Sequence, residues 1–246
     1  MSKLKLNWNP VILTKFLVGV TCILTLINVI IQFAIYSFGL NDEWFLLFNM
    51  DKEVNIPTLF SCCLFLLGSF LIKLIEGKSN KKKIYIIQKW RVLKWIFLFL
   101  AFDEGFQIHE AFIIPSFKPL MPPALTVIWV IPYGIFAICC FLYFLPLIMN
   151  LPSRIRNLIL ISGTTYVSGA LGLEIMGSFL VRTGDIRLHG ISYGLISTLE
   201  ETLELAGLIL FIYALLSYIF NHQKQKIKLN LRLASIKSNA GAKQLY

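Results

Sequence analysis

The sequence has little charge for its length. Only 15% of its 246 residues are Asp, Glu, Lys or Arg, whereas a soluble globular domain carries about 25%. Hydrophobic residues make up 57% of the chain, and the mean hydropathy is +0.74. The scarcity of charge, with long apolar runs between the charged groups, excludes an ordinary soluble domain. It predicts a polytopic helical membrane protein, because a helix satisfies its own backbone hydrogen bonds in lipid.

The cysteines lack the spacing of a zinc or redox motif. The chain has five, and four of them form the adjacent pairs Cys62-Cys63 and Cys139-Cys140 instead of a CxxC arrangement. All five fall in apolar runs, so we interpret them as small packing residues. The apolar runs also lack a Glu-x-x-His pair, which helical bundles with two metal ions use.

Six apolar runs are long enough to cross a bilayer, which takes about 20 residues of helix. They predict an all-α bundle of six transmembrane helices in residues 1–220, followed by a basic cytoplasmic tail at 221–246. The predicted spans are 16–38, 57–75, 92–114, 124–149, 157–181 and 191–220.

The basic residues are distributed unequally between the loops. With these spans, 19 of the 23 Lys and Arg residues fall on one side of the membrane. The exceptions are Lys52, Lys118, Arg182 and Arg187. By the positive-inside rule, both termini are expected in the cytoplasm of a bacterial cell, with the protein in the inner (plasma) membrane. The net charge of +10 is then a topology signal and predicts no nucleic-acid binding. The lysine cluster at 81–83 is expected to contact anionic lipids of the bilayer at the cytoplasmic face.

The carboxylates are the informative residues. Seven of the thirteen lie within predicted spans, where an ionised group nominally costs about 2.5–3.5 kcal/mol at the helix centre and is by default a functional-site hypothesis. At about 1.5 Å per residue, the third, fifth and sixth spans deliver these acids to the outer half of the bilayer. The seven are Asp103, Glu104, Glu110, Glu174, Glu200, Glu201 and Glu204.

The helical faces of these acids agree with their depths. At about 100° per residue, the three acids of the sixth span share a face with Tyr193 and Ser197. Gln107 shares a face with the acids of the third span, and Arg182 lies within reach of Glu174 on the fifth. We therefore expect one buried site between these three spans, with Gln107, Arg182, Tyr193 and Ser197 in supporting positions.

The acids have no lysine at their depth, so they must be protonated, open to water or bound to a cation. A metal ion is the leading hypothesis, because carboxylates with one histidine suit hard or borderline ions, of which iron and manganese are the candidates. The expected ligands are Asp103, Glu104, His109, Glu110, Glu174, Glu200, Glu201 and Glu204. Structural alternatives are a hydrogen-bonded His109, a solvated vestibule at Glu200 and Glu201, and an ion pair between Glu174 and Arg182.

Four segments of the chain resemble motifs of a functionally uncharacterised family of bacterial multi-pass membrane proteins. They are 48–58, the Phe-Asp-Glu at 102–104 with His-Glu at 109–110, the segment 168–174, and the segment 199–207. The resemblance covers most of the chain between 44 and 216 and implies topology without chemistry. It also implies that Asp51 and Glu53, just outside the second span, belong with the acidic site.

Together these patterns predict an integral inner-membrane protein with a buried carboxylate/histidine metal site. Its expected activity is that of a metal-dependent oxidoreductase acting on a lipid or a quinone. The first alternative is a proton- or cation-coupled transporter or channel, since chains of Asp and Glu also form relays. The chain shows no evident internal repeat, so a transporter would need a homodimer to supply its second half. The second alternative is a membrane scaffold or assembly subunit without chemistry.

Overall fold

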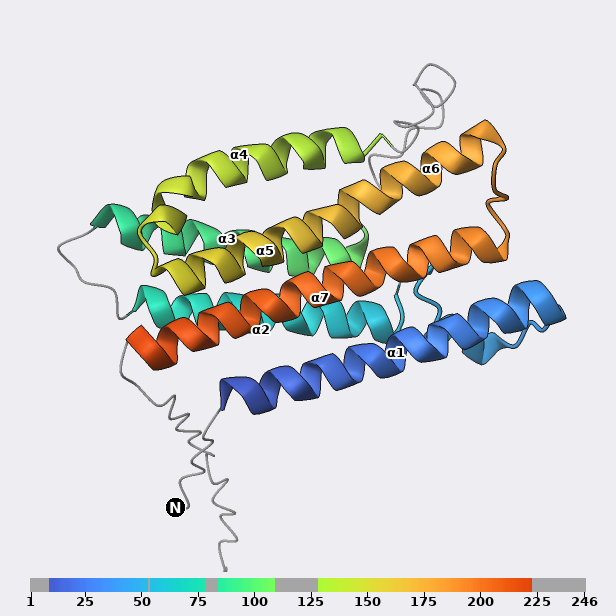
Figure 1. Cartoon of the computed structure of the whole chain (residues 1–246), viewed down its shortest axis with the longest axis horizontal. Helices are drawn as coiled ribbons and strands as arrows, with labels where there is room; N and C mark the ends of the chain where they lie inside the picture. Colours follow the sequence, from blue (N-terminus) through green and yellow to red (C-terminus); the bar gives the residue numbers. More distant parts are fainter. Residues whose placement is uncertain (1–8, 53, 78–83, 109–127, 223–246) are drawn as a thin grey trace, which may run out of the picture.

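The computed structural model describes residues 9–52, 54–77, 84–108 and 128–222, and over these ranges it is all-helical (Figure 1). Its regular elements are α1 (Pro10–Phe38), the 3-10 helix η1 (Glu43–Leu47), α2 (Ile56–Glu76), α3 (Ile84–Phe106), α4 (Val130–Met149), α5 (Ser153–Val167), the π-helical η5 (Ser168–Leu173), α6 (Glu174–Thr183) and α7 (Ile191–His222). The segments α5, η5 and α6 follow one another without a break, so they form one rod from Ser153 to Thr183.

Five helices in the described ranges are long and apolar enough to cross a membrane, with the α5–α6 rod counted as one. They present large apolar side chains outward, such as Ile12, Phe16 and Ile23 on α1, which are 67%, 64% and 61% exposed. The remaining long helix, α3, carries Lys89, Arg91, Lys94, Asp103 and Glu104 and is less apolar. Of the six expected apolar spans, five correspond to helices that are apolar enough to cross a membrane. The described part of α3 is not among these five helices.

Helix α3 is displaced along the chain from the expected span at 92–114. It begins at Ile84 and ends at Phe106. Gln107 has a left-handed backbone with φ of 54°, and the amide of Ile108 closes the turn on the carbonyl of Asp103 at 3.2 Å. A left-handed residue is a common way to end a helix. The expectation that Gln107 shares a helical face with Asp103 is therefore wrong.

Residues at the helix ends explain why other helices begin and stop where they do. The side chain of Asn9 accepts a hydrogen bond of 2.9 Å from the amide of Val11, and Asn55 accepts one of 2.9 Å from Thr58. Each of these caps precedes a proline at the first or second helical position. Proline is tolerated there because the N–H groups of the first turn have no partner within the helix. Gly39, with φ of 67°, ends α1 in the left-handed conformation.

Helix α7 lies at the centre of the bundle and packs against α1, α2 and α5 (Figure 1). Its C-terminal half is largely buried, with Ile212, Leu215 and Ile219 at 0% exposure. Helix α4 lies at the edge of the bundle and packs only lightly on α3 and α5. A core built around α7, with α4 held loosely at one side, leaves room between α4 and the other helices.

Candidate functional site

A cavity of about 1070 Å³ occupies that room, with α2, α3, α4, the α5–α6 rod and α7 around it. One part of its wall is acidic and the other is aliphatic and aromatic. The acids on the wall are Asp51, Asp103, Glu104, Glu174, Glu200, Glu201 and Glu204. Every predicted in-span acid that the structure describes thus lies on the wall of the same cavity.

Three helices bring these acids together. Asp103 and Glu104 occupy the last turn of α3, and Glu174 is the first residue of α6. The π-helical segment η5 ends directly before Glu174, and such bulges rotate the residues that follow onto a different face. At Gly169 in this segment, an added Cβ would lie 2.7 Å from the carbonyl oxygen of Glu200 on α7. The absence of a side chain there lets the rod approach the acidic turn of α7.

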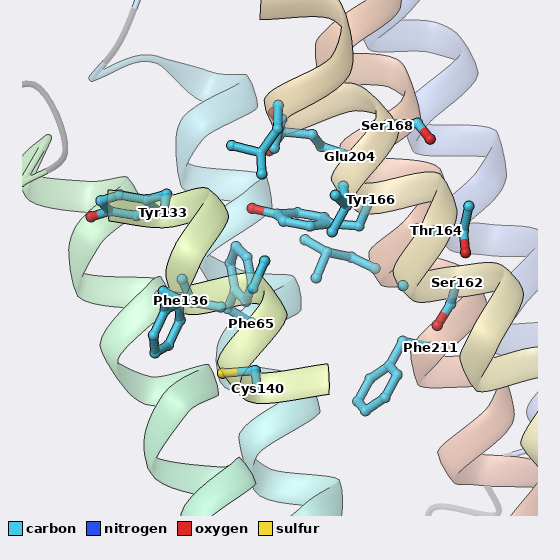
Figure 2. A pocket seen from close by; sticks show the side chains of 18 of the residues that line it. Phe65, Tyr133, Phe136, Cys140, Ser162, Thr164, Tyr166, Ser168, Glu204 and Phe211 are labelled. Carbon is cyan, nitrogen blue, oxygen red and sulfur yellow. The ribbon is translucent and has the colours of Figure 1, made fainter. Parts of the chain in front are cut away.

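Two tyrosines are hydrogen-bonded to acids of the wall. The Tyr133 hydroxyl on α4 donates a bond of 2.7 Å to Asp103, whose side chain is buried at 6% exposure. The Tyr166 hydroxyl on α5 donates to Glu204 on α7. Figure 2 shows Tyr166 reaching into the cavity beneath Glu204. These phenols stabilise carboxyl oxygens that the apolar surroundings would otherwise leave poorly solvated.

The carboxyl groups of Glu200 on α7 and Glu174 on α6 lie beside each other. An ionised carboxylate can only accept hydrogen bonds, so a hydrogen bond between two such groups requires a proton on one of them. A shared proton is one of the ways in which closely spaced acids remain buried without basic partners.

The loop before α2 brings Asp51 to the same cavity. Burial raises the pKa of the Asp51 carboxyl, while Lys52 at 3.6 Å, the charge of His189 and a hydrogen bond from Ser197 lower it in part. The predicted supporting residues Asp51 and Ser197 are therefore in contact. Tyr193, one turn earlier on α7, also lines the cavity.

A buried amide network fixes this loop on α1 and α7. Asn28 on α1 donates a bond of 2.7 Å to the Thr198 hydroxyl on α7, and its oxygen accepts one of 3.0 Å from the backbone amide of Met50. Gln32, one turn further along α1, donates a bond of 2.8 Å to Asn49. The network holds the two residues that precede Asp51.

Several predicted site residues lie elsewhere or outside the described ranges. Gln107 and Arg182 are not among the described residues of the cavity wall. His109, Glu110 and Glu53 lie outside the residues that the structure describes. Across the described ranges, no three His, Cys, Asp or Glu side chains are grouped closely enough to hold a metal ion. The acids are instead spread along the wall.

The sequence reasoning missed Tyr133 and Tyr166. Each lies within a predicted span, which was the available signal, because a buried tyrosine hydroxyl generally finds a partner. It also missed Lys89, which is 3% exposed on α3. The Lys89 ammonium donates to the carbonyl of Tyr143 on α4 and lies 3.8 Å from the centroid of that ring.

The fold and the cavity define a helical protein of membrane type with a carboxylate-lined internal cavity. The chain belongs to the family described as a domain of unknown function (DUF8692), which matches residues 16–219. No curated protein and no solved structure matches the chain. The family assignment agrees with the expected membership of an uncharacterised family.

Proposed function

We propose that the acidic part of the cavity binds a cation, and that this cation is a metal ion such as iron or manganese. The observation that supports the proposal is the charge of the wall, which carries seven carboxylates. Lys52 is the one basic residue among the described residues of that wall. Carboxyl groups gathered in an apolar interior favour the binding of protons or of a cation, because charges of one sign repel one another.

Carboxylate oxygens suit hard and borderline ions, which favours iron or manganese over copper. Since the described acids are spread along the wall, an ion would need them to draw together. It could also take ligands from His109 and Glu110, which we place at the same site on the sequence pattern. The expected activity is oxidoreduction of a lipid or quinone, which the apolar part of the same cavity supports.

Metal analysis of the purified protein tests this proposal. We expect iron or manganese to copurify in a fixed ratio with the wild-type chain and to fall in a Glu201→Ala variant. A Glu43→Ala variant, which alters an exposed acid of η1, should retain the metal of the wild type. Background metal in the wild-type protein would refute the metal site.

Proton or cation transfer is the second candidate function, favoured by the run of acids and phenols along the wall. Asp51 contacts Ser197 on α7, Glu200 lies beside Glu174, and Glu204 is hydrogen-bonded to Tyr166. Groups of this kind, arranged from a loop to the middle of a helix, are typical of proton relays. Proton flux into proteoliposomes should then fall in Asp103→Asn. If the protein shows neither bound metal nor proton flux, the result favours the second alternative, a scaffold or assembly subunit.

The proposed setting is the bacterial inner membrane, with α3 as the sixth span and both termini in the cytoplasm. The basic residues of α3 support this, because Lys89, Arg91 and Lys94 lie in its first half, near the expected cytoplasmic face. Glu76 at the end of α2 accepts bonds of 2.7 Å from Arg91 and 2.9 Å from Lys94, which compensates those charges. Reporter fusions at each terminus should both report the cytoplasm. The proposal also includes three further expectations. They are contact of the 81–83 loop with anionic lipid, membership of a bacterial family with this acidic motif pattern, and a homodimer.

A further inference from the structure

The part of the cavity away from the acids is lined by hydrocarbon and aromatic groups. They include Phe65 on α2, Phe97 on α3, Phe136 and Phe144 on α4, and Phe211 on α7. Figure 2 shows Phe65, Phe136 and Cys140 together below the Tyr166 hydroxyl. An apolar space of this kind does not hold ordered water, because water there lacks hydrogen-bond partners.

The cavity is elongated along the helices. On α3 the apolar part of its wall extends from Trp90 to Leu100, about 15 Å at ~1.5 Å per residue. On α4 the apolar part extends from Phe136 to Ile148, about 18 Å by the same ~1.5 Å rise. These lengths are at least half of the roughly 30 Å thickness of the hydrocarbon core of a bilayer. A long apolar space parallel to lipid chains suits a chain-shaped ligand better than a compact one.

The cavity is also open toward the outside of the bundle at α4. Phe136, Ile138 and Phe141 line the cavity and are nevertheless 37%, 61% and 49% exposed. Residues that face both the cavity and the surroundings mark an opening along this helix. With α4 in a bilayer, the medium at that opening is lipid, so a membrane amphiphile can enter sideways without crossing water.

We infer that the cavity binds one single-chain amphiphile from the bilayer, with its hydrocarbon chain in the apolar part and an uncharged oxygen head group beside Tyr166 and Glu204. The chemical class is that of long-chain alcohols, aldehydes, ketones and quinones. An anionic head would be repelled by the wall acids, and a cationic head would compete with the proposed ion. The inference rests on the proposed cation site for the charge of the head group.

Two adjacent cysteines on α4 provide a matched pair of reporters. Cys140 lies on the cavity wall, whereas Cys139 is exposed and is not among the wall residues. In the variants Cys139→Ala and Cys140→Ala, the thiol that remains at this position reports either the cavity or the outer surface. The full-length protein in bilayer nanodiscs is treated with an apolar maleimide, and modification of the α4 peptide is followed by mass spectrometry.

The probes are octadecanol and octadecyl sulfonate at equal mole fraction in the bilayer. Octadecanol at about tenfold above its dissociation constant should slow Cys140 labelling by about tenfold, since bound ligand shields the thiol in proportion to occupancy. Labelling of Cys139 should not change, and the sulfonate should leave both thiols unprotected. Equal protection of Cys140 by both probes would overturn the assignment of the head group. An unchanged Cys140 rate with octadecanol would overturn the binding site itself.

A second variant separates this inference from the proposed function. Ala137→Phe adds a ring to the cavity wall one turn from Cys140 and should abolish the effect of octadecanol on Cys140. Metal content is measured on the same samples. Protection of Cys140 without bound metal would refute the metal site and support the lipid site, whereas bound metal without protection would do the reverse.

Discussion

The hydroxyl of Tyr133 on α4 and the carboxylate of Asp103 on α3 are joined by a hydrogen bond of 2.7 Å. Toward the other end of α4, the Lys89 ammonium on α3 donates to the carbonyl of Tyr143. The two contacts lie ten residues apart on α4, about 15 Å at ~1.5 Å per residue. Because α4 otherwise packs lightly, this pair of polar contacts fixes the helix that forms the open side of the cavity.

The contact between Tyr133 and Asp103 should contribute measurably to stability. We expect Tyr133→Phe to lower the free energy of unfolding by about 1–3 kcal/mol, the usual range when a buried polar group loses a hydrogen bond. Thermal unfolding in detergent measures the change. Tyr143→Phe on the same helix keeps the ring that packs against Lys89 and should have a smaller effect. Equal losses in the two variants would contradict a specific role for the Tyr133 hydroxyl.

The buried side-chain amide of Asn28 should contribute strongly to the stability of the fold. It connects α1, the loop before α2 and α7, and its side chain is 0% exposed. Asn28→Ala leaves the amide of Met50 and the hydroxyl of Thr198 without this partner, which should cost about 1–3 kcal/mol. Asn150→Ala removes a bond to the Pro146 carbonyl at an exposed position and should cost less than about 0.5 kcal/mol. Chemical unfolding of both variants tests the difference.

The raised pKa of Asp51 predicts a dependence of stability on pH. A raised carboxyl pKa means that the folded protein binds the proton more tightly than the unfolded chain does. The associated stability is fully present below the unfolded pKa of about 3.9 and is lost as the pH rises through the folded pKa. Asp51→Asn should remove this loss, so its unfolding temperature should decline less than that of the wild type between acidic and neutral pH.

Asp42→Asn is the matched control for this pH dependence, because Asp42 is an exposed residue of the loop before η1. Its unfolding temperature should follow the pH profile of the wild type. Parallel profiles for Asp51→Asn and Asp42→Asn would contradict the assignment to Asp51.

The sequence predicted the convergence of the acids better than the course of the chain around them. Depth and helical face depend on residue spacing alone, so Glu174, Glu200 and Glu204 could be placed near one another from the sequence. The end of α3 could not, because it depends on Gln107 adopting a left-handed backbone, which single-residue preferences disfavour. The apolar residues at 95–102 and 111–114, on either side of the polar stretch, hid this turn.

The π-helical segment before Glu174 was equally hidden, since it leaves no change in the hydrophobic pattern. Counting about 100° per residue across this segment misplaces the face of Glu174 relative to α5. The predicted supporting residue Arg182 is not among the described residues of the cavity wall. The tyrosine partners of the acids were missed for another reason. Tyr133 and Tyr166 meet their carboxylates only after α4 and α5 are packed beside α3 and α7, so tertiary arrangement decided those contacts.

The close approach of α5 and α7 provides the last prediction. At Gly207 an added Cβ would lie 2.7 Å from the amide nitrogen of Tyr166 and 2.9 Å from the carbonyl oxygen of Ser162. Both are backbone atoms of α5, so the helix itself would have to move. Gly207→Ala should therefore destabilise the protein by about 1–3 kcal/mol, as overpacking of a dense interior does.

Gly163→Ala on α5 is the matched substitution. An added Cβ there meets nothing within 4 Å, so helix propensity dominates and the variant should be more stable than the wild type by up to about 1 kcal/mol. Gly207 allows the close contact of α5 and α7 that brings Tyr166 beside Glu204. Gly207→Ala should therefore also alter the cavity wall at these two residues. Octadecanol should then protect Cys140 less in Gly207→Ala than in Gly163→Ala. Equal stability of the two variants would show that α5 and α7 are not held together at this contact.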